Sequence, residues 1–215
     1  EHRPEDFDAL HLLGLLNYQR HRMVEALHFL SAALKVNSGS SDAMSNLGLA
    51  LDATGRYEEA ISSFRHALQL APDHPEILFN LGNVYLKLGR IAEALASYEG
   101  VLTNEPAHVG SLVNRGNALL RLNRPDEALA SYDHALTLAP GHPQILTNRG
   151  HARRRLDRPV EALADFSAAL AAAPQFAEAH FEAAMTHLSL GDFAAGWKEY
   201  EWRWKTDAFA GQRRQ

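Results

Sequence analysis

The chain has 215 residues, of which 46% are hydrophobic and 22% are charged, a balance that excludes extensive disorder and is typical of a folded globular protein. Its formal net charge is −5, from 21 basic and 26 acidic residues, whereas a nucleic-acid-binding protein usually carries an excess of Lys and Arg. The apolar runs are far shorter than a bilayer span requires, so we expect neither nucleic acid nor a membrane as a partner.

The chain contains no cysteine, which excludes disulfides, thiolate metal sites and a cysteine nucleophile. The absence of cysteine fits the cytoplasmic location that we predict, although a cysteine-free protein persists in any redox compartment. The start of the chain has no basic segment followed by an apolar one, so no secretory signal is predicted. Because the first residue is Glu1 rather than Met, we expect a fragment or a processed form.

A 34-residue repeat runs through the chain, with a small residue at Gly14, Gly48, Gly82, Gly116, Gly150 and Ala184. Twelve residues later an alanine recurs, at Ala26, Ala60, Ala94, Ala128 and Ala162, with Gly196 in the sixth unit. Sixteen residues later a large side chain recurs, at Leu30, Phe64, Tyr98, Tyr132, Phe166 and Tyr200. Twenty-four residues later come Ser38, Pro72, Pro106, Pro140, Pro174 and Ala208. Such periodicity is typical of stacked helical repeats.

Each unit predicts a helical hairpin: a helix, a tight turn, a second helix and a short loop. The small residue lets the second helix approach closely, the alanine faces it, the large side chain fills the gap between neighbouring hairpins, and the proline ends the second helix. We place the hairpins at 7–40, 41–74, 75–108, 109–142, 143–176 and 177–210, with an N-terminal flank at 1–6 and a C-terminal tail at 211–215. Stacking these hairpins buries a continuous core.

Turn residues separate the two helices in the second to sixth units, at Gly55-Arg56, Gly89-Arg90, Asn123-Arg124, Asp157-Arg158 and Gly191-Asp192. Gly, Asn and Asp tolerate the left-handed conformation that ends a helix. A glutamate follows near the start of the second helix, where negative charge is favourable, at Glu25, Glu59, Glu93, Glu127 and Glu161.

The spacing of small residue, alanine, aromatic residue and proline resembles the tetratricopeptide repeat over nearly the whole chain. The resemblance implies an all-α, right-handed α-solenoid of six helix-turn-helix repeats. It also implies a concave groove, lined by the first helix of each hairpin, that holds a protein or an extended peptide.

Finer features are similar to the repeats of O-linked N-acetylglucosamine transferases, among them Asn-Leu-Gly-Asn at 80–83 and the run from Leu190 to Trp204. This similarity implies the substrate-recognition arm of a larger glycosyltransferase-like protein, with a covalently linked C-terminal domain. The alternative is a free-standing adaptor or a self-associating assembly module. The sequence shows no phosphate-binding loop and no nucleophile motif, so we predict that this chain is not an enzyme and uses no cofactor.

Four asparagines occupy one phase of the repeat, two residues before the small residue, at Asn46, Asn80, Asn114 and Asn148. Asparagine is unfavourable inside a helix, so its recurrence needs an explanation. Asn83 and Asn117 follow at i+3 and share the same helix face. We predict that these amides bind the backbone of a peptide through their donor and acceptor groups, a role that the resemblance to the transferases also implies. The alternative is that they only bond backbone groups between repeats.

A basic cluster comprises Arg149, Arg153, Arg154 and Arg155, with Arg115 and Arg121 one repeat earlier. Arg121 and Arg155 share a phase seven residues after an asparagine of the series, so we predict that they flank the groove and favour an acidic ligand. The alternative is an ordinary solvated face.

The C-terminal segment holds all three tryptophans, between Trp197 and Trp204. Helical spacing predicts one apolar face made of Phe193, Trp197, Tyr200 and Trp204. We predict that this face docks on a linked domain or pairs with a second copy in a homodimer; the alternative is a cap packed on the preceding repeat.

Twelve histidines raise the question of a metal site. His74, His108 and His142 recur with the repeat period rather than with the spacing of a coordination set. We therefore predict no metal site.

Overall fold

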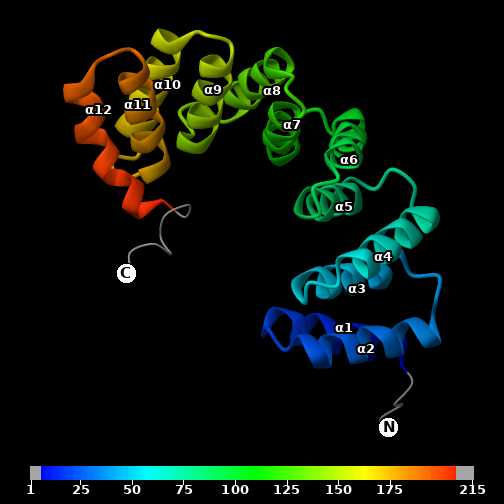
Figure 1. The fold of residues 1–215 in the computed structure, drawn as a ribbon. Helices are drawn as coiled ribbons and strands as arrows, with labels where there is room; N and C mark the ends of the chain where they lie inside the picture. The colour runs from blue at the N-terminus through cyan, green and yellow to red at the C-terminus, as the bar shows by residue number, and fades with distance from the viewer. Residues whose placement is uncertain (1–5, 207–215) are drawn as a thin grey trace. The chain divides into compact units, whose positions relative to one another are not determined.

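The computed structural model describes residues 6–206, and this part of the chain contains twelve α-helices and a short 3-10 helix with no strand (Figure 1). The helices are α1 (Phe7–Gln19), α2 (Met23–Val36), α3 (Ser41–Ala53), α4 (Tyr57–Leu70), α5 (Pro75–Lys87), α6 (Ile91–Asn104), α7 (Val109–Arg121), α8 (Pro125–Leu138), α9 (Pro143–Arg155), α10 (Pro159–Ala172), α11 (Ala177–Ser189), α12 (Phe193–Tyr200) and the 3-10 helix η1 (Glu201–Lys205). The predicted all-α fold of six hairpins is confirmed. Most of the predicted flank at 1–6, the predicted tail at 211–215 and the end of the sixth repeat with Ala208 lie outside the described residues.

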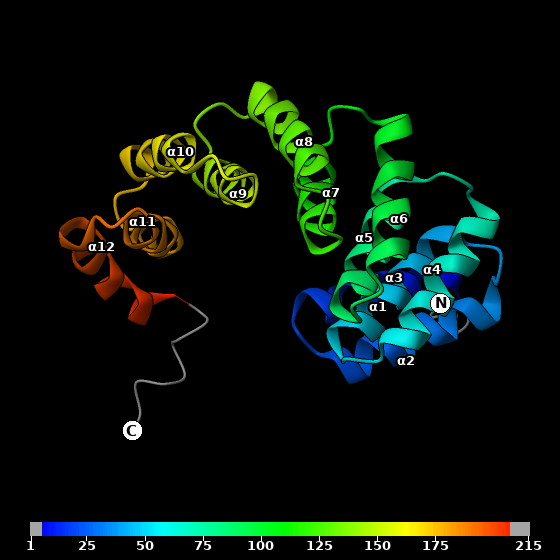
Figure 2. The same ribbon diagram turned by 45° about the horizontal axis from the view of Figure 1, so that its top comes forward.

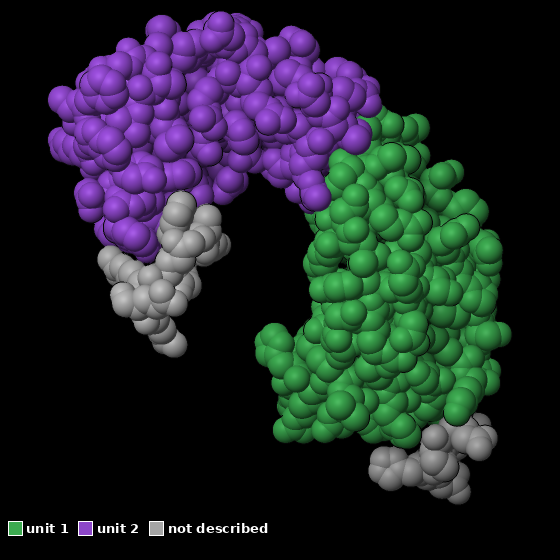
Figure 3. All heavy atoms as spheres, in the orientation of Figure 1, with its two compact units in different colours: residues 1–106 green, residues 107–215 purple. Residues whose placement is uncertain are grey.

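The hairpins fall into two compact units, residues 1–106 and residues 107–215 (Figure 3), which we call unit 1 and unit 2. Within each unit, a second helix packs against the first helix of its own hairpin and against the first helix of the next one. Consecutive first helices, such as α3 and α5 or α9 and α11, also touch (Figure 2). A row of adjoining first helices is therefore available in each unit.

The turn inside each hairpin depends on one residue in the left-handed conformation. The predicted residues all adopt it: Gly55, Gly89, Asn123, Asp157 and Gly191 have φ values of 76°, 74°, 58°, 57° and 80°. In the first hairpin His21 takes this conformation, with φ at 57°, although a side chain there costs about 1 kcal/mol. The sequence pattern does not indicate this turn, because the first unit has no Gly, Asn or Asp between its two helices.

In the first five hairpins the repeat glycine lies under the large side chain of its own hairpin. A Cβ added to Gly48 would lie 2.8 Å from the Phe64 ring, and one added to Gly150 would lie 2.5 Å from the Phe166 ring. The large side chain closes the space above the glycine, and Phe166 also packs with Ala183 of the next hairpin, as the repeat predicts. The five predicted alanines and four aromatic rings are fully buried, at Ala26, Ala60, Ala94, Ala128, Ala162, Phe64, Tyr98, Tyr132 and Phe166.

Proline sets the helix boundaries as the repeat predicts. Helices α4, α6, α8 and α10 each end two residues before the proline of their unit. Proline also occupies the first turn of four helices, where its missing N–H is no loss, at Pro75, Pro125, Pro143 and Pro159. None of the helices between residues 6 and 206 has the length and apolar character needed to cross a membrane.

Candidate functional site

In unit 1 the predicted asparagines lie on adjoining first helices and are all partly exposed. The Nδ2 atom of Asn46 on α3 lies 2.8 Å from Nε2 of His11 on α1. Asn80, on α5, makes no side-chain hydrogen bond within the described part of unit 1. A carboxamide can donate twice and accept twice, so Asn80 presents a full set of groups and Asn46 keeps its carbonyl oxygen.

Asn83 and Asn117, which directly follow the repeat glycine, accept hydrogen bonds from the tyrosines of their own hairpins. The Tyr98 hydroxyl donates to Oδ1 of Asn83 at 2.8 Å, and the Tyr132 hydroxyl donates to Oδ1 of Asn117 at 2.7 Å. Burial raises the pKa of Tyr132, which keeps its hydroxyl protonated and able to donate. Asn83 and Asn117 therefore tie the second helix of a hairpin to the first.

The pairing of tyrosine with asparagine can also be traced in the sequence. The residue after the repeat glycine is Asn in the third and fourth units, and the aromatic residue fifteen positions later is then Tyr. Where that residue is Leu49 or His151, the aromatic residue is Phe64 or Phe166 instead. Among these four units, tyrosine occurs where an amide can accept its hydroxyl proton, whereas the sixth unit has Tyr200 after Met185.

In unit 2 the asparagines bond to one another. The Nδ2 group of Asn148 on α9 donates to Oδ1 of Asn117 on α7 at 3.1 Å, and Gln144 donates to Oδ1 of Asn148 at 3.0 Å. Asn114 is also partly exposed on α7. The alternative of internal bonding therefore applies to part of the series, but the partners shown here are side chains rather than backbone groups.

The basic cluster is largely neutralised inside unit 2. Asp165, whose side chain is only 4% exposed, accepts from Arg149 at 2.6 Å and from Arg153 at 2.8 Å. Arg149 also pairs with Asp133 at 2.8 Å. Burial opposes the charged form of Arg149, yet its hydrogen bonds to Asp165 and Asp133 outweigh it and raise the pKa. Arg149 and Arg153 therefore stabilise the packing of α8, α9 and α10 and are not free for a ligand.

The other arginines of the cluster also have partners. Arg154 pairs with Glu182 at 2.8 Å, and Arg155 donates from Nη2 to the backbone oxygen of Leu120 at 3.0 Å. Because Leu120 precedes Arg121, the structure brings Arg121 and Arg155 to the same end of α7 and α9. Both residues are exposed, and a guanidinium has five donors, so the guanidinium of Arg155 can still meet an acidic group beside the asparagines.

The predicted aromatic face divides into two parts. Phe193 and Trp197 on α12 are 61% and 58% exposed. Tyr200 instead packs near Phe181 of α11, with ring centroids 5.9 Å apart. The α-helix ends at Tyr200, so Trp204 falls in the 3-10 segment, out of helical register, where its ring lies 4.3 Å from the Arg203 guanidinium. Of the four predicted residues, Phe193 and Trp197 are the exposed ones, and the Trp197 ring meets the Tyr200 ring edge-on at 5.5 Å.

His180 holds the 3-10 segment against α11. Its ring stacks on Trp202 with centroids 3.9 Å apart and planes 9° from parallel. Its Nδ1 contacts the Glu199 carboxylate and its Nε2 lies 3.0 Å from the Pro174 carbonyl oxygen. The sequence does not predict this contact, because the stacking between residues 180 and 202 follows neither a helical spacing nor the repeat spacing.

We expect His180→Ala to release the segment around Trp202. The stack and the ring's two polar contacts would be lost, at a cost of about 1 kcal/mol for the aromatic pair. The change should appear as faster tryptic cleavage at Arg203 and Lys205 and as a red shift of tryptophan emission. His187→Ala is the matched control, since His187 contacts only Asp192, at 3.1 Å; equal cleavage of both variants would contradict the role of His180.

The described residues contain no group of three or more His, Asp or Glu side chains arranged to hold a metal ion. The candidate site consists of partly exposed amides on neighbouring first helices, with Arg121 and Arg155 at one end of α7 and α9 in unit 2.

Comparisons with known proteins support this fold. Sequence profiles of the tetratricopeptide repeat match residues 5–73, 39–104, 79–143 and 147–201. No curated protein sequence matches the chain.

Three solved structures illustrate the likeness. A tetratricopeptide repeat protein from Parabacteroides merdae is 21% identical with a TM-score of 0.82, over 91% of this chain and 77% of that one. YrrB, described as a TPR protein with an unusual peptide-binding site, is 22% identical with a TM-score of 0.73, over 82% and 91% of the two chains. The pilF protein of Pseudomonas aeruginosa is 20% identical with a TM-score of 0.75, over 90% and 88%. At these identities the likeness shows the fold alone.

Proposed function

We propose, since the chain belongs to the tetratricopeptide repeat family, that it is a scaffold whose first helices hold an extended polypeptide segment. The observation that carries this proposal is the half-buried amide of Asn80, which has no hydrogen-bond partner among residues 6–206 although it lies inside a helix. An extended backbone presents N–H and C=O groups that an amide can both accept from and donate to. Binding of this kind gives affinity without demanding one sequence.

The surroundings of the amides add selectivity. In unit 1, Leu12 occupies the same repeat phase as Asn46 and Asn80, and it is 65% exposed. In unit 2, Arg121 and Arg155 lie at one end of the helices that carry Asn114 and Asn148. An apolar side chain would therefore be favoured near α1, and an acidic one near the C-terminal ends of α7 and α9.

Two settings fit this binding role. The similarity of the run from Leu190 to Trp204 to glycosyltransferase-linked repeats supports a substrate-recognition arm, and the exposed Phe193 and Trp197 offer a surface for a linked domain or a second copy. The fact that the chain covers 91% of YrrB and 88% of pilF supports a free-standing adaptor. The coding sequence downstream of Gln215 distinguishes the two.

The combined variant Asn46→Ala and Asn80→Ala tests the proposal on the 215-residue chain. The probe is an unstructured peptide selected by the wild-type chain from a random peptide array. We expect its dissociation constant to rise about tenfold or more, because two hydrogen bonds of about 1 kcal/mol each are lost. Fluorescence anisotropy measures the affinity, and circular dichroism should show unchanged helix content.

The matched control is Asn104→Ala, an exposed amide on the second helix α6. It should leave peptide affinity unchanged. Unaltered affinity of the double variant, or its unfolding, would show that Asn46 and Asn80 serve only the packing of the hairpins.

A further inference from the structure

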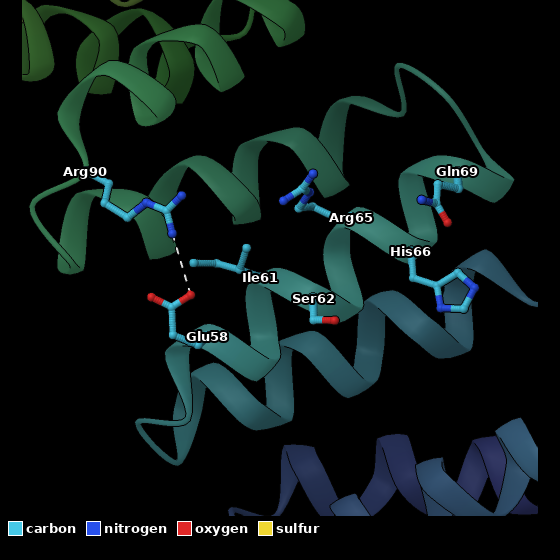
Figure 4. A pocket seen from close by; sticks show the side chains of 7 residues that line it. All are labelled: Glu58, Ile61, Ser62, Arg65, His66, Gln69 and Arg90. Carbon is cyan, nitrogen blue, oxygen red and sulfur yellow. Dashed lines mark ion pairs between the residues drawn. The ribbon is translucent and has the colours of Figure 1, made fainter.

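Unit 1 has a cleft between the second helices α4 and α6, with residues of α5 and Leu68 of α4 at its floor, and an adjoining hollow along α4 that reaches Arg90 (Figure 4). Two adjoining hollows of about 440 and 640 Å³ share Arg65, Gln69 and Arg90. The floor of the larger one is apolar and consists of Leu68, Leu78, Leu81 and Tyr85. The cleft exists because each second helix packs on first helices, which leaves a space above the first helix that they share.

The two arginines at the rim differ in their partners. Arg90 lies 2.9 Å from Glu93 and 3.6 Å from Glu58, and its guanidinium lies 4.7 Å from the centre of the Tyr85 ring. Arg65, which projects from α4 beside the cleft in Figure 4, makes no hydrogen bond or ion pair with any described residue. Arg65 is therefore the uncommitted cation at the edge of an apolar floor.

The repeat supplies an internal comparison for this cleft. Two repeats later, the positions of Arg65, Leu81 and Ser97 are occupied by Asp133, Arg149 and Asp165. There Arg149 pairs with Asp133 at 2.8 Å and with Asp165 at 2.6 Å, and Arg153 pairs with Asp165 as well, so the two aspartates meet two arginines inside unit 2. In unit 1 the same positions hold a lone cation above a leucine and a serine. Arg65 is exposed, so its guanidinium can accept a carboxylate from another molecule as partner without breaking an internal ion pair.

We propose that the α4–α6 cleft is a second binding site, for a short acidic and apolar peptide segment. An aliphatic side chain enters between Leu68, Leu78 and Leu81, and a neighbouring carboxylate pairs with Arg65. A carboxylate fits the planar guanidinium in a bidentate arrangement. Glu58 and Glu93 line the same cleft and pair with Arg90, so these carboxylates oppose a polyanion such as nucleic acid.

This site goes beyond the amide site because none of the six asparagines lines the cleft. The test uses the 215-residue chain and two acetylated, amidated peptides, Ser-Leu-Glu-Leu-Ser and Ser-Leu-Gln-Leu-Ser. Amide chemical shifts measured by NMR report binding. We expect the glutamate peptide to bind about tenfold more tightly than the glutamine peptide, with the largest shifts at Leu78, Leu81 and Ser97.

The variant Arg65→Gln should abolish the difference between the two peptides, since it removes the cation and keeps an exposed polar side chain. The variant Asn46→Ala with Asn80→Ala should leave this difference intact, which separates the two sites. Equal binding of both peptides by the wild type, a difference that survives Arg65→Gln, or no binding up to about 10 mM would each overturn the proposal.

Discussion

Replacing Asp165 by alanine is expected to lower the free energy of unfolding of unit 2 by about 3 kcal/mol. The carboxylate is 4% exposed and neutralises Arg149 and Arg153, whose side chains are only 20% and 18% exposed. Without it, two positive charges stay beside each other with little water to solvate them. Urea unfolding followed by far-ultraviolet circular dichroism measures the loss.

The repeat itself provides the control for this prediction. Three repeats earlier, the positions of Arg149, Arg153 and Asp165 are Leu47, Leu51 and Ser63, and that hairpin is well packed. The triple variant Arg149→Leu, Arg153→Leu and Asp165→Ser should therefore unfold within about 1 kcal/mol of the wild type, because apolar side chains can replace a buried ion pair without loss. A triple variant as unstable as Asp165→Ala would refute the view that the unpaired charges cause the loss.

Gly116→Ala is expected to destabilise the fourth hairpin by about 1–2 kcal/mol. A Cβ at Gly116 would lie 2.5 Å from Cε1 and 2.6 Å from Cζ of Tyr132. The ring cannot move aside easily, since it is fully buried and its hydroxyl is bonded to Asn117 at 2.7 Å. Overpacking of this kind costs up to about 3 kcal/mol, and the better helix propensity of alanine returns about 1 kcal/mol.

Gly100→Ala, on α6, is the matched control. Its added Cβ would meet Cδ1 of Leu78 at 3.2 Å, the far end of a flexible side chain. Here the gain in helix propensity should offset the small adjustment, and the thermal midpoint should stay equal or rise. If both glycine variants behaved alike, the close approach of the Tyr132 ring would not be what requires glycine at position 116.

The helices and their turns could be predicted from sequence because their determinants are local. Proline after the second helix and Gly, Asn or Asp at the turn act within a few residues of themselves, and the repeat shows them several times over. The buried alanines and aromatic residues followed from the same period. The left-handed turn at His21 was not predicted, because the position lacks the Gly, Asn or Asp that marks the turns of the other hairpins.

The candidate site was predicted less completely because its contacts connect helices. The repeat position of the asparagines predicted that Asn46 and Asn80 lie on first helices. It did not predict the hydrogen bonds that Asn83 and Asn117 accept from tyrosine hydroxyls. The basic cluster looked available for a ligand because the sequence places Asp165 sixteen residues from Arg149. These two residues come into contact only because α9 and α10 form a hairpin. The end of α12 at Tyr200 likewise depends on how the next residues meet His180.

The packing of each helix on its own and the adjoining hairpin has a consequence for how such a gene can change. Duplication or deletion of 34 codons adds or removes one hairpin and leaves the remaining interfaces chemically complete, provided that the joined neighbours match. The ion pairs of Arg149 restrict where this can happen, since Asp133 lies on α8 and Asp165 on α10. A recombination event between α8 and α9 would remove Asp133, one of the two partners of Arg149. The fourth and fifth hairpins should therefore be inherited together.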